Sequence, residues 1–168
     1  MRTLRLLLAA FALQACAHPT APRAAVPSGG PGAAAWERLK SALPGSWTMP
    51  GKSGPFVVSY RLVSAGSALV EEWGAGTPHE TLTVFYPDGA ESWLTHYCAQ
   101  GNQPRLRVVG ASANTVVFRF VDVTNRQPGQ DVLVQRTLRL GADSFDDTEV
   151  YRSDDGHDET TTYHFTRR

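Results

Sequence analysis

The chain has 168 residues, with sixteen basic and sixteen acidic side chains and a formal net charge of zero. No run of Lys and Arg provides the basic surface that binds a nucleic acid backbone, so we predict no nucleic acid partner. The two cysteines are Cys16 and Cys98, so modification or removal of Cys16 would leave no intrachain disulfide.

Residues 1–16 have the features of a signal peptide. Arg2 and Arg5 precede an apolar stretch that is much shorter than the roughly 20 residues needed to span a bilayer. The stretch ends in Leu13-Gln14-Ala15-Cys16, which resembles a bacterial lipobox with Gln14 in place of the usual small residue. The resemblance implies lipidation at Cys16 and anchoring to a membrane of the cell envelope, facing the periplasm or the exterior. Ordinary cleavage at the Ala15-Cys16-Ala17 pattern would instead give a secreted soluble protein.

A linker and one domain are expected after the signal. Residues 17–34 contain almost no bulky side chain and predict a flexible linker rich in Ala, Pro and Gly. Residues 35–168 have the length of a single domain. A short helix over residues 34–43 is expected at its start, because Trp36, Leu39 and Leu43 recur at helical spacing before Pro44-Gly45.

The rest of the chain has the period of two that is typical of β-strands. Besides a short strand near Trp47, strands are expected over residues 56–63, 69–73, 81–86, 91–98, 105–109, 115–121, 132–140, 144–151 and 158–165. Short turns such as Pro87-Asp88-Gly89 and Asp155-Gly156 favour antiparallel pairing of consecutive strands. Closure of the sheet would remove its exposed edges. We therefore predict an all-β fold, an antiparallel up-and-down barrel of about nine or ten strands with a short N-terminal helix.

Gly45-Ser46-Trp47 resembles the G-x-W signature of lipocalins and related calycin barrels. The resemblance implies that Trp47 closes one end of a lipocalin-like barrel beneath the N-terminal helix, with Arg167 or Arg168 of the last strand against it. Trp47 could also be simply a large core residue.

A second likeness covers most of residues 43–166. The runs S-A-L-V-E-E, G-T-P-H-E and L-T-H-Y-C-A-Q-G-N-Q-P-R-L are similar to a group of bacterial lipocalin-like proteins of uncharacterised function, which includes secreted and lipid-anchored members. This resemblance implies no particular activity. Haem-binding barrels of the nitrobindin type are more distant, and the glycine-rich segment that follows their G-x-W is absent here. His164 could ligate iron in such a barrel, but we predict no cofactor.

The candidate binding residues cluster around the strand at 91–98. Trp93, Thr95 and Tyr97 share one face of this strand, and Leu94, His96 and Cys98 share the other. A solid barrel would take the first face inward and a barrel with a wet cavity the second, so the sequence leaves both open. A hairpin centred on Pro87-Asp88-Gly89 would place His79 near Cys98 and Thr81 near His96.

These positions predict a ligand-binding site at one end of the barrel. Its candidate residues are Glu72, His79, His96, Cys98, Asn102, Gln103 and Arg105. Histidine normally titrates near neutral pH, which makes His96 the candidate for acid–base or ligand contacts, and the amides and the guanidinium offer hydrogen bonds to a carboxylate, an amide or a phosphate. Each also has a structural interpretation, as a hydrogen-bonded histidine, a buried thiol, turn-capping amides and a solvated Arg105.

The predicted function is the binding of a small apolar or amphipathic molecule inside the barrel. The first alternative is an enzyme that uses the same pocket, with His96 as acid–base and Glu72 or Arg105 orienting the substrate. The second is a structural or interaction lipoprotein whose barrel is filled. We predict no catalytic nucleophile at Cys98 and no metal site, although His79, His96 and Cys98 are suitable zinc ligands by type. Asp143, Asp146 and Asp147 are expected at solvated hairpin tips.

Overall fold

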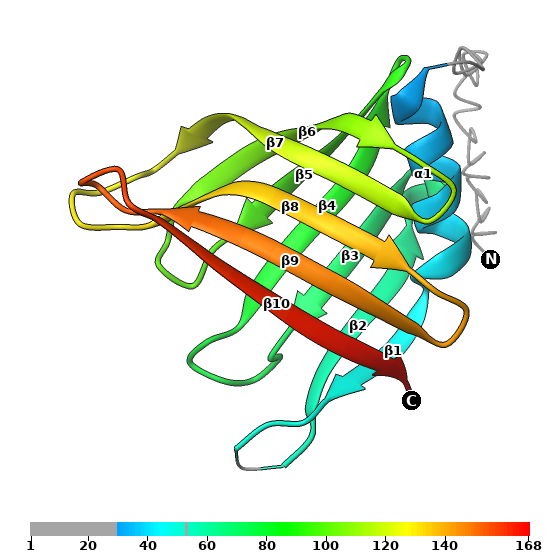
Figure 1. The fold of residues 1–168 in the computed structure, drawn as a ribbon, viewed down its shortest axis with the longest axis horizontal. Helices are drawn as coiled ribbons and strands as arrows, with labels where there is room; N and C mark the ends of the chain where they lie inside the picture. Colours follow the sequence, from blue (N-terminus) through cyan, green and yellow to red (C-terminus); the bar gives the residue numbers. More distant parts are fainter. Residues whose placement is uncertain (1–29, 53) are drawn as a thin grey trace, which may run out of the picture.

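Ten strands pair with their neighbours in sequence and close into an antiparallel barrel (Figure 1). The computed structural model describes residues 30–52 and 54–168, so the predicted signal peptide, Cys16 and most of the linker lie outside the described residues. The strands are β1 (Gly45–Met49), β2 (Phe56–Val63), β3 (Ala68–Trp73), β4 (Thr81–Asp88), β5 (Glu91–Tyr97), β6 (Gln103–Ala111), β7 (Thr115–Thr124), β8 (Val132–Leu140), β9 (Ser144–Arg152) and β10 (Asp158–Arg167). Because β10 pairs with β1, the sheet has no free edge. The predicted all-β up-and-down barrel is confirmed.

The helix α1 (Pro31–Ala42) lies directly before the barrel, and the 3-10 turn η1 (Ser64–Gly66) links β2 to β3. The helix begins at Pro31 rather than at residue 34, so the last residues assigned to the linker are helical. Pro31 suits the first turn because its missing amide hydrogen would have no partner there. Trp36, Leu39 and Leu43 are buried, as the apolar stripe predicts.

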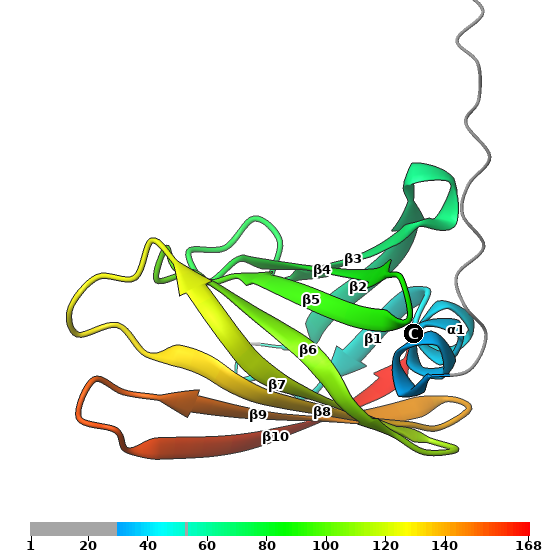
Figure 2. The ribbon, with the colours of Figure 1, turned by 90° about the horizontal axis from the view of Figure 1, so that it is seen from above.

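The helix closes one end of the barrel (Figure 2). It packs against β4, β5 and β6, and Ser92 Oγ donates a hydrogen bond to the Gly32 carbonyl at 2.7 Å. A Cβ at Gly32 would lie 2.5 Å from the Ala90 carbonyl oxygen, so only glycine permits this approach. The β2–β3, β4–β5, β6–β7 and β8–β9 links share the helix end, and the other five links lie at the opposite, open end (Figure 1).

Apolar side chains fill the helix end of the lumen. The ring centroids of Trp47 and Phe145 are 4.9 Å apart, and Phe145 stacks on Phe165 at 4.9 Å. The guanidinium of Arg167 lies 4.1 Å from the Trp47 ring centroid, and Trp47 pairs with Arg167 across β1 and β10. Arg167 also donates hydrogen bonds to the carbonyl of Ala42, the last residue of α1, at 3.1 Å and to the carbonyl of Pro44 at 3.2 Å. Arg167 therefore packs on Trp47 beside the end of α1, and the barrel-closing role of this pair stays a prediction.

The β4–β5 hairpin differs from its predicted register by two residues. Thr83, not Thr81, lies opposite His96, because Pro87 and Asp88 continue β4 and the turn consists of Gly89 and Ala90. Gly89 has a φ of 58°, which favours glycine at the first position of a two-residue hairpin turn. A shift of two residues leaves the same side chains on each face.

Candidate ligand-binding site

A cavity of about 370 Å³ occupies the open end of the barrel. Side chains from β3, β4, β5, β9 and β10 and from the adjoining loops line it: Glu71, Trp73, His79, Thr81, His96, Cys98, Ala99, Gln100, Asp131, Glu149, Tyr151, Glu159, Thr161 and Tyr163. The face of β5 that carries His96 points inward, whereas Tyr97 is 46 % exposed. The lumen is therefore filled with apolar side chains near the helix and hollow near the opposite end.

Beneath the cavity, Arg136 of β8 is fully buried at the centre of an ion-pair network. Its guanidinium donates hydrogen bonds to Glu71 at 2.6 and 3.0 Å and to Asp147 at 2.5, 3.1 and 3.2 Å. The Tyr60 hydroxyl donates to Glu71 at 2.5 Å. Phe85 lies on the helix side, with the guanidinium 5.5 Å from its ring centroid. The network thus separates the apolar layer from the cavity.

The carboxyl groups around Arg136 respond differently to burial. Burial alone would raise the pKa of Glu71, but the charge and hydrogen bonds of Arg136 lower it below its ordinary value. For Asp147 burial prevails over the attraction of Arg136, and its pKa is raised. A buried guanidinium that is held by two acids forms a stable floor only while both partners are present.

Glu149 faces the cavity beside this network. Burial, and next the charge of Asp147, raises the pKa of Glu149 to about 8, which favours the protonated acid at neutral pH. The nearest cationic atom is Arg136 Nε at 3.5 Å, and that nitrogen already donates to Asp147. Within residues 30–52 and 54–168, no group donates a hydrogen bond to the Glu149 carboxyl group.

His96 connects the floor to the cavity wall. Arg136 donates to Thr83 Oγ1 at 3.4 Å, and Thr83 Oγ1 lies 3.0 Å from His96 Nδ1. His96 Nε2 lies 3.3 Å from the Tyr151 hydroxyl, and the tautomer of the imidazole ring sets which atom donates in each of these two hydrogen bonds. Burial and the nearby Arg136 lower the pKa of His96 to about 4, which keeps it neutral at pH 7.

Aromatic side chains form much of the cavity wall. Trp73 and Tyr163 meet edge to face with centroids 5.0 Å apart, and Trp73 also contacts Phe165 at 5.1 Å. Tyr151 adds a third ring across from His96, with centroids 6.5 Å apart. The wall therefore offers apolar surface above a polar floor.

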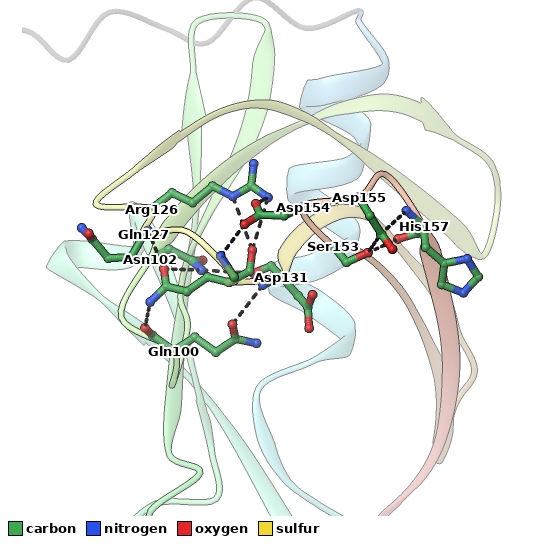
Figure 3. Close-up of polar contacts among 11 residues, drawn as sticks. Gln100, Asn102, Arg126, Gln127, Asp131, Ser153, Asp154, Asp155 and His157 are labelled. Atoms are coloured by element: carbon green, nitrogen blue, oxygen red, sulfur yellow. Dashed lines mark hydrogen bonds and ion pairs between the residues drawn. The ribbon is translucent and has the colours of Figure 1, made fainter.

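Hydrogen bonds link the loops around the open end (Figure 3). Asn102 Nδ2 donates to the Asp131 carbonyl at 3.1 Å, and the Asp131 amide donates to Gln100 Oε1 at 3.0 Å. Arg126 bonds to Asp154 of the β9–β10 turn at 2.5 Å. Three successive loops of the rim are thus fixed to one another, and Gln100 and Asp131 both reach the cavity.

The structure brings His79, His96 and Cys98 together in the cavity lining, as their placement on one hairpin predicted. His96 is buried at the floor, and His79 is exposed at the mouth. Cys98 is a free, half-buried thiol, and burial raises its pKa. Their role in ligand binding stays a prediction.

The other four candidate residues do not line the cavity. Glu72 points outward to Ser59 and Arg61 because its neighbour Glu71 takes the inward position of β3. The remaining three are occupied elsewhere: Asn102 holds the rim, Gln103 bonds to Gly101 and Thr124, and Arg105 forms an exposed ion pair with Asp122 on the outer face. His164 also lies outside the lumen and bonds to Asp146 at 2.6 Å.

Residues of β8 and β9 supply much of the site and were not predicted. Asp147 was expected at a solvated hairpin tip, but it is fully buried against Arg136, so that expectation was wrong. The signal for β9 was present, because Phe145, Asp147, Glu149 and Tyr151 alternate along one face.

No known family model and no curated protein matches this chain. What the structure shows is a closed ten-strand antiparallel barrel, an architecture consistent with a lipocalin-like protein. Among the described residues, no three His, Cys, Asp or Glu side chains are grouped as a metal site, and no helix is long and apolar enough to cross a membrane.

Proposed function

We propose that the protein binds a small, partly apolar molecule in the cavity at the open end of its barrel. The observation that carries this proposal is the hollow of about 370 Å³ inside a closed wall, with aromatic rings on its sides and hydrogen-bonding groups at its base. Cavities of this size and mixed lining are typical of small-molecule sites. The apolar layer around Trp47 and Phe145 supports the wall from below without filling that space.

Binding is favoured over catalysis by the state of His96. Both of its ring nitrogens already have partners in Thr83 and Tyr151, and its lowered pKa makes it a weak base. The raised pKa of Cys98 likewise disfavours a thiolate nucleophile at neutral pH.

Native mass spectrometry of the purified protein tests the proposal. We expect a bound small molecule that denaturing extraction releases, or a hit from a ligand screen that changes the fluorescence of Trp73. Trp73→Phe assigns that signal, because three other tryptophans are present. Protein that is consistently empty and inert to a broad screen would contradict the proposal.

We further propose that this binding occurs in the cell envelope, through a lipid anchor at Cys16. Support comes from the lipobox-like Leu13-Gln14-Ala15-Cys16 and the linker-like composition that follows. Cys16→Ala should move the protein from the membrane fraction to the soluble fraction of its bacterial host. Unchanged membrane association would contradict the anchor and leave ligand binding unaffected.

A further inference from the structure

The charge of the cavity lining is strongly one-sided. Four carboxyl groups line it, those of Glu71, Asp131, Glu149 and Glu159, and the described lining residues include no Lys or Arg. The buried Arg136 beneath the cavity does not offset this, because Glu71 and Asp147 bind its guanidinium from both sides. An anion entering the cavity would meet the carboxylates of Asp131 and Glu159 and no cationic side chain among the described lining residues, so its binding is disfavoured.

The position of Glu149 independently favours a cationic ligand. Its side chain is only 9 % exposed and borders the cavity. The nearest cationic atom among the described residues, Arg136 Nε at 3.5 Å, already donates to Asp147, so Glu149 has no cation of its own. A positively charged group in the cavity would supply one and would favour the ionised form of Glu149.

The aromatic wall fits the same ligand chemistry. Trp73, Tyr151 and Tyr163 border the space next to Glu149, and aromatic rings attract organic cations through the negative charge of their faces. The same rings offer apolar surface to the rest of the ligand. A carboxylate combined with several rings is suited to an ammonium group on an apolar body.

We propose that the ligand of this cavity is an organic cation, a protonated or quaternary amine on a small apolar body, with its charged group between Glu149 and the rings of Trp73, Tyr151 and Tyr163. This inference rests on the proposed binding function and adds its ligand class. The Tyr151 hydroxyl also borders this space and can form a hydrogen bond elsewhere on the same ligand.

The protonation of Glu149 gives the proposal a pH signature. Three charged groups act directly on the Glu149 carboxyl group: Asp147 on β9, Arg136 on β8 and Glu71 on β3. The other titratable groups that line the cavity are Tyr151 on β9, Glu159 and Tyr163 on β10, His96 on β5, Cys98 in the turn after β5, and His79 and Asp131 in the loops. A cation favours ionised Glu149, so binding should release a proton below pH 8. Affinity for a permanently charged ligand should therefore rise with pH, by up to about tenfold per unit below 8.

The test is a panel of near-isosteric compounds measured against the purified protein by calorimetry. Phenethylammonium and benzyltrimethylammonium carry the cation, phenethyl alcohol is neutral, and 3-phenylpropionate is anionic. We expect both cations to bind at least tenfold more tightly than the alcohol, and 3-phenylpropionate to bind most weakly. Benzyltrimethylammonium does not titrate, so the rise of its affinity between pH 6 and pH 8 reports on the protein.

Two variants test whether Glu149 provides the negative charge that binds the cation. Glu149→Gln should weaken both cations at least tenfold and remove the pH dependence, while affinity for phenethyl alcohol stays within twofold. Glu37→Gln, which removes an exposed carboxylate on α1 at the closed end, should change nothing. The ranking of the panel on the unmodified protein decides the matter even if Glu149→Gln does not fold.

The outcomes separate the two proposals. If the alcohol or the carboxylate binds as tightly as the cations, the ligand class is wrong and the binding function stands. If no member of the panel binds and the protein also stays empty in native mass spectrometry, both proposals are overturned.

Discussion

Replacement of Arg136 by Met is the strongest test of how this barrel is stabilised. Methionine has a similar length but no charge, so the variant loses the five hydrogen bonds that join Arg136 to Glu71 and Asp147. Both acids are at most 1 % exposed, and they lose the only cation close to them among the described residues. Removal of one partner from such a network typically costs about 3–5 kcal/mol. This is a large part of the stability of a domain, which is typically about 5–15 kcal/mol.

The assay is urea unfolding followed by circular dichroism at pH 7 and pH 5. Without Arg136, burial raises the folded-state pKa of Glu71 and Asp147 above their unfolded values, so the folded variant binds more protons than the unfolded chain. Its stability then falls as the pH rises through that interval, and the deficit relative to the unmodified protein should be smaller at pH 5. Arg139→Met, on the outer face of the same strand, is the control and should cost less than about 1 kcal/mol.

A triple variant, with Glu71→Gln and Asp147→Asn added to Arg136→Met, tests the mechanism. It should recover a substantial part of the loss, because it removes the unpaired charges. A loss below about 1 kcal/mol for Arg136→Met, equal at both pH values, would refute the view that this network is a dry ion-pair cluster.

Three further predictions concern single side chains. The Glu149→Gln variant should become more stable relative to the unmodified protein as the pH rises from 5 to 8. The reason is that the folded-state pKa of Glu149, about 8, lies above the ordinary 4.5, so the unmodified protein loses stability over this interval. Thermal unfolding across that range measures the difference, and a constant difference would argue against a buried, titrating Glu149. The Arg167→Met variant should lower the free energy of unfolding by about 1–2 kcal/mol, because the cation over Trp47 and two hydrogen bonds are lost. Arg168→Met is the control, and an equal effect in both variants would contradict a stabilising role of these Arg167 contacts. Cys98 should react slowly with a thiol reagent at pH 7.5 and rapidly in urea, because burial raises its pKa; equal rates in the two conditions would show that the thiol is not protected by the fold.

The strands were predictable because alternation and turn residues act locally. The expected bounds of the strands at 56–63 and 132–140 match β2 and β8, and the short links correctly indicated consecutive antiparallel pairing. The face of β5 was not predictable, since Trp93 and His96 are both acceptable in a lumen and only the whole barrel decides between them.

The buried ion-pair network of Arg136 was not predicted from the sequence, for a different physical reason. Arg136 stands between Gln135 and Thr137, and such a sequence is typical of a solvent-facing strand. A bulge between Leu133 and Gln135 shifts the alternation, so that Leu133 and Arg136 are both buried. No local rule predicts that shift, and the partners of Arg136 come from a strand 65 residues earlier as well as from the next one.

The division of the lumen into a filled half and a hollow half has a consequence for evolvability. The rings of Trp47, Phe145 and Phe165 are buried at the end covered by the helix, whereas Trp73 and Tyr163 border solvent-accessible space. Substitutions at the mouth of the cavity can therefore change which ligand binds while the free energy of unfolding of the barrel is largely retained. The same separation makes this barrel a practical starting point for engineered receptors.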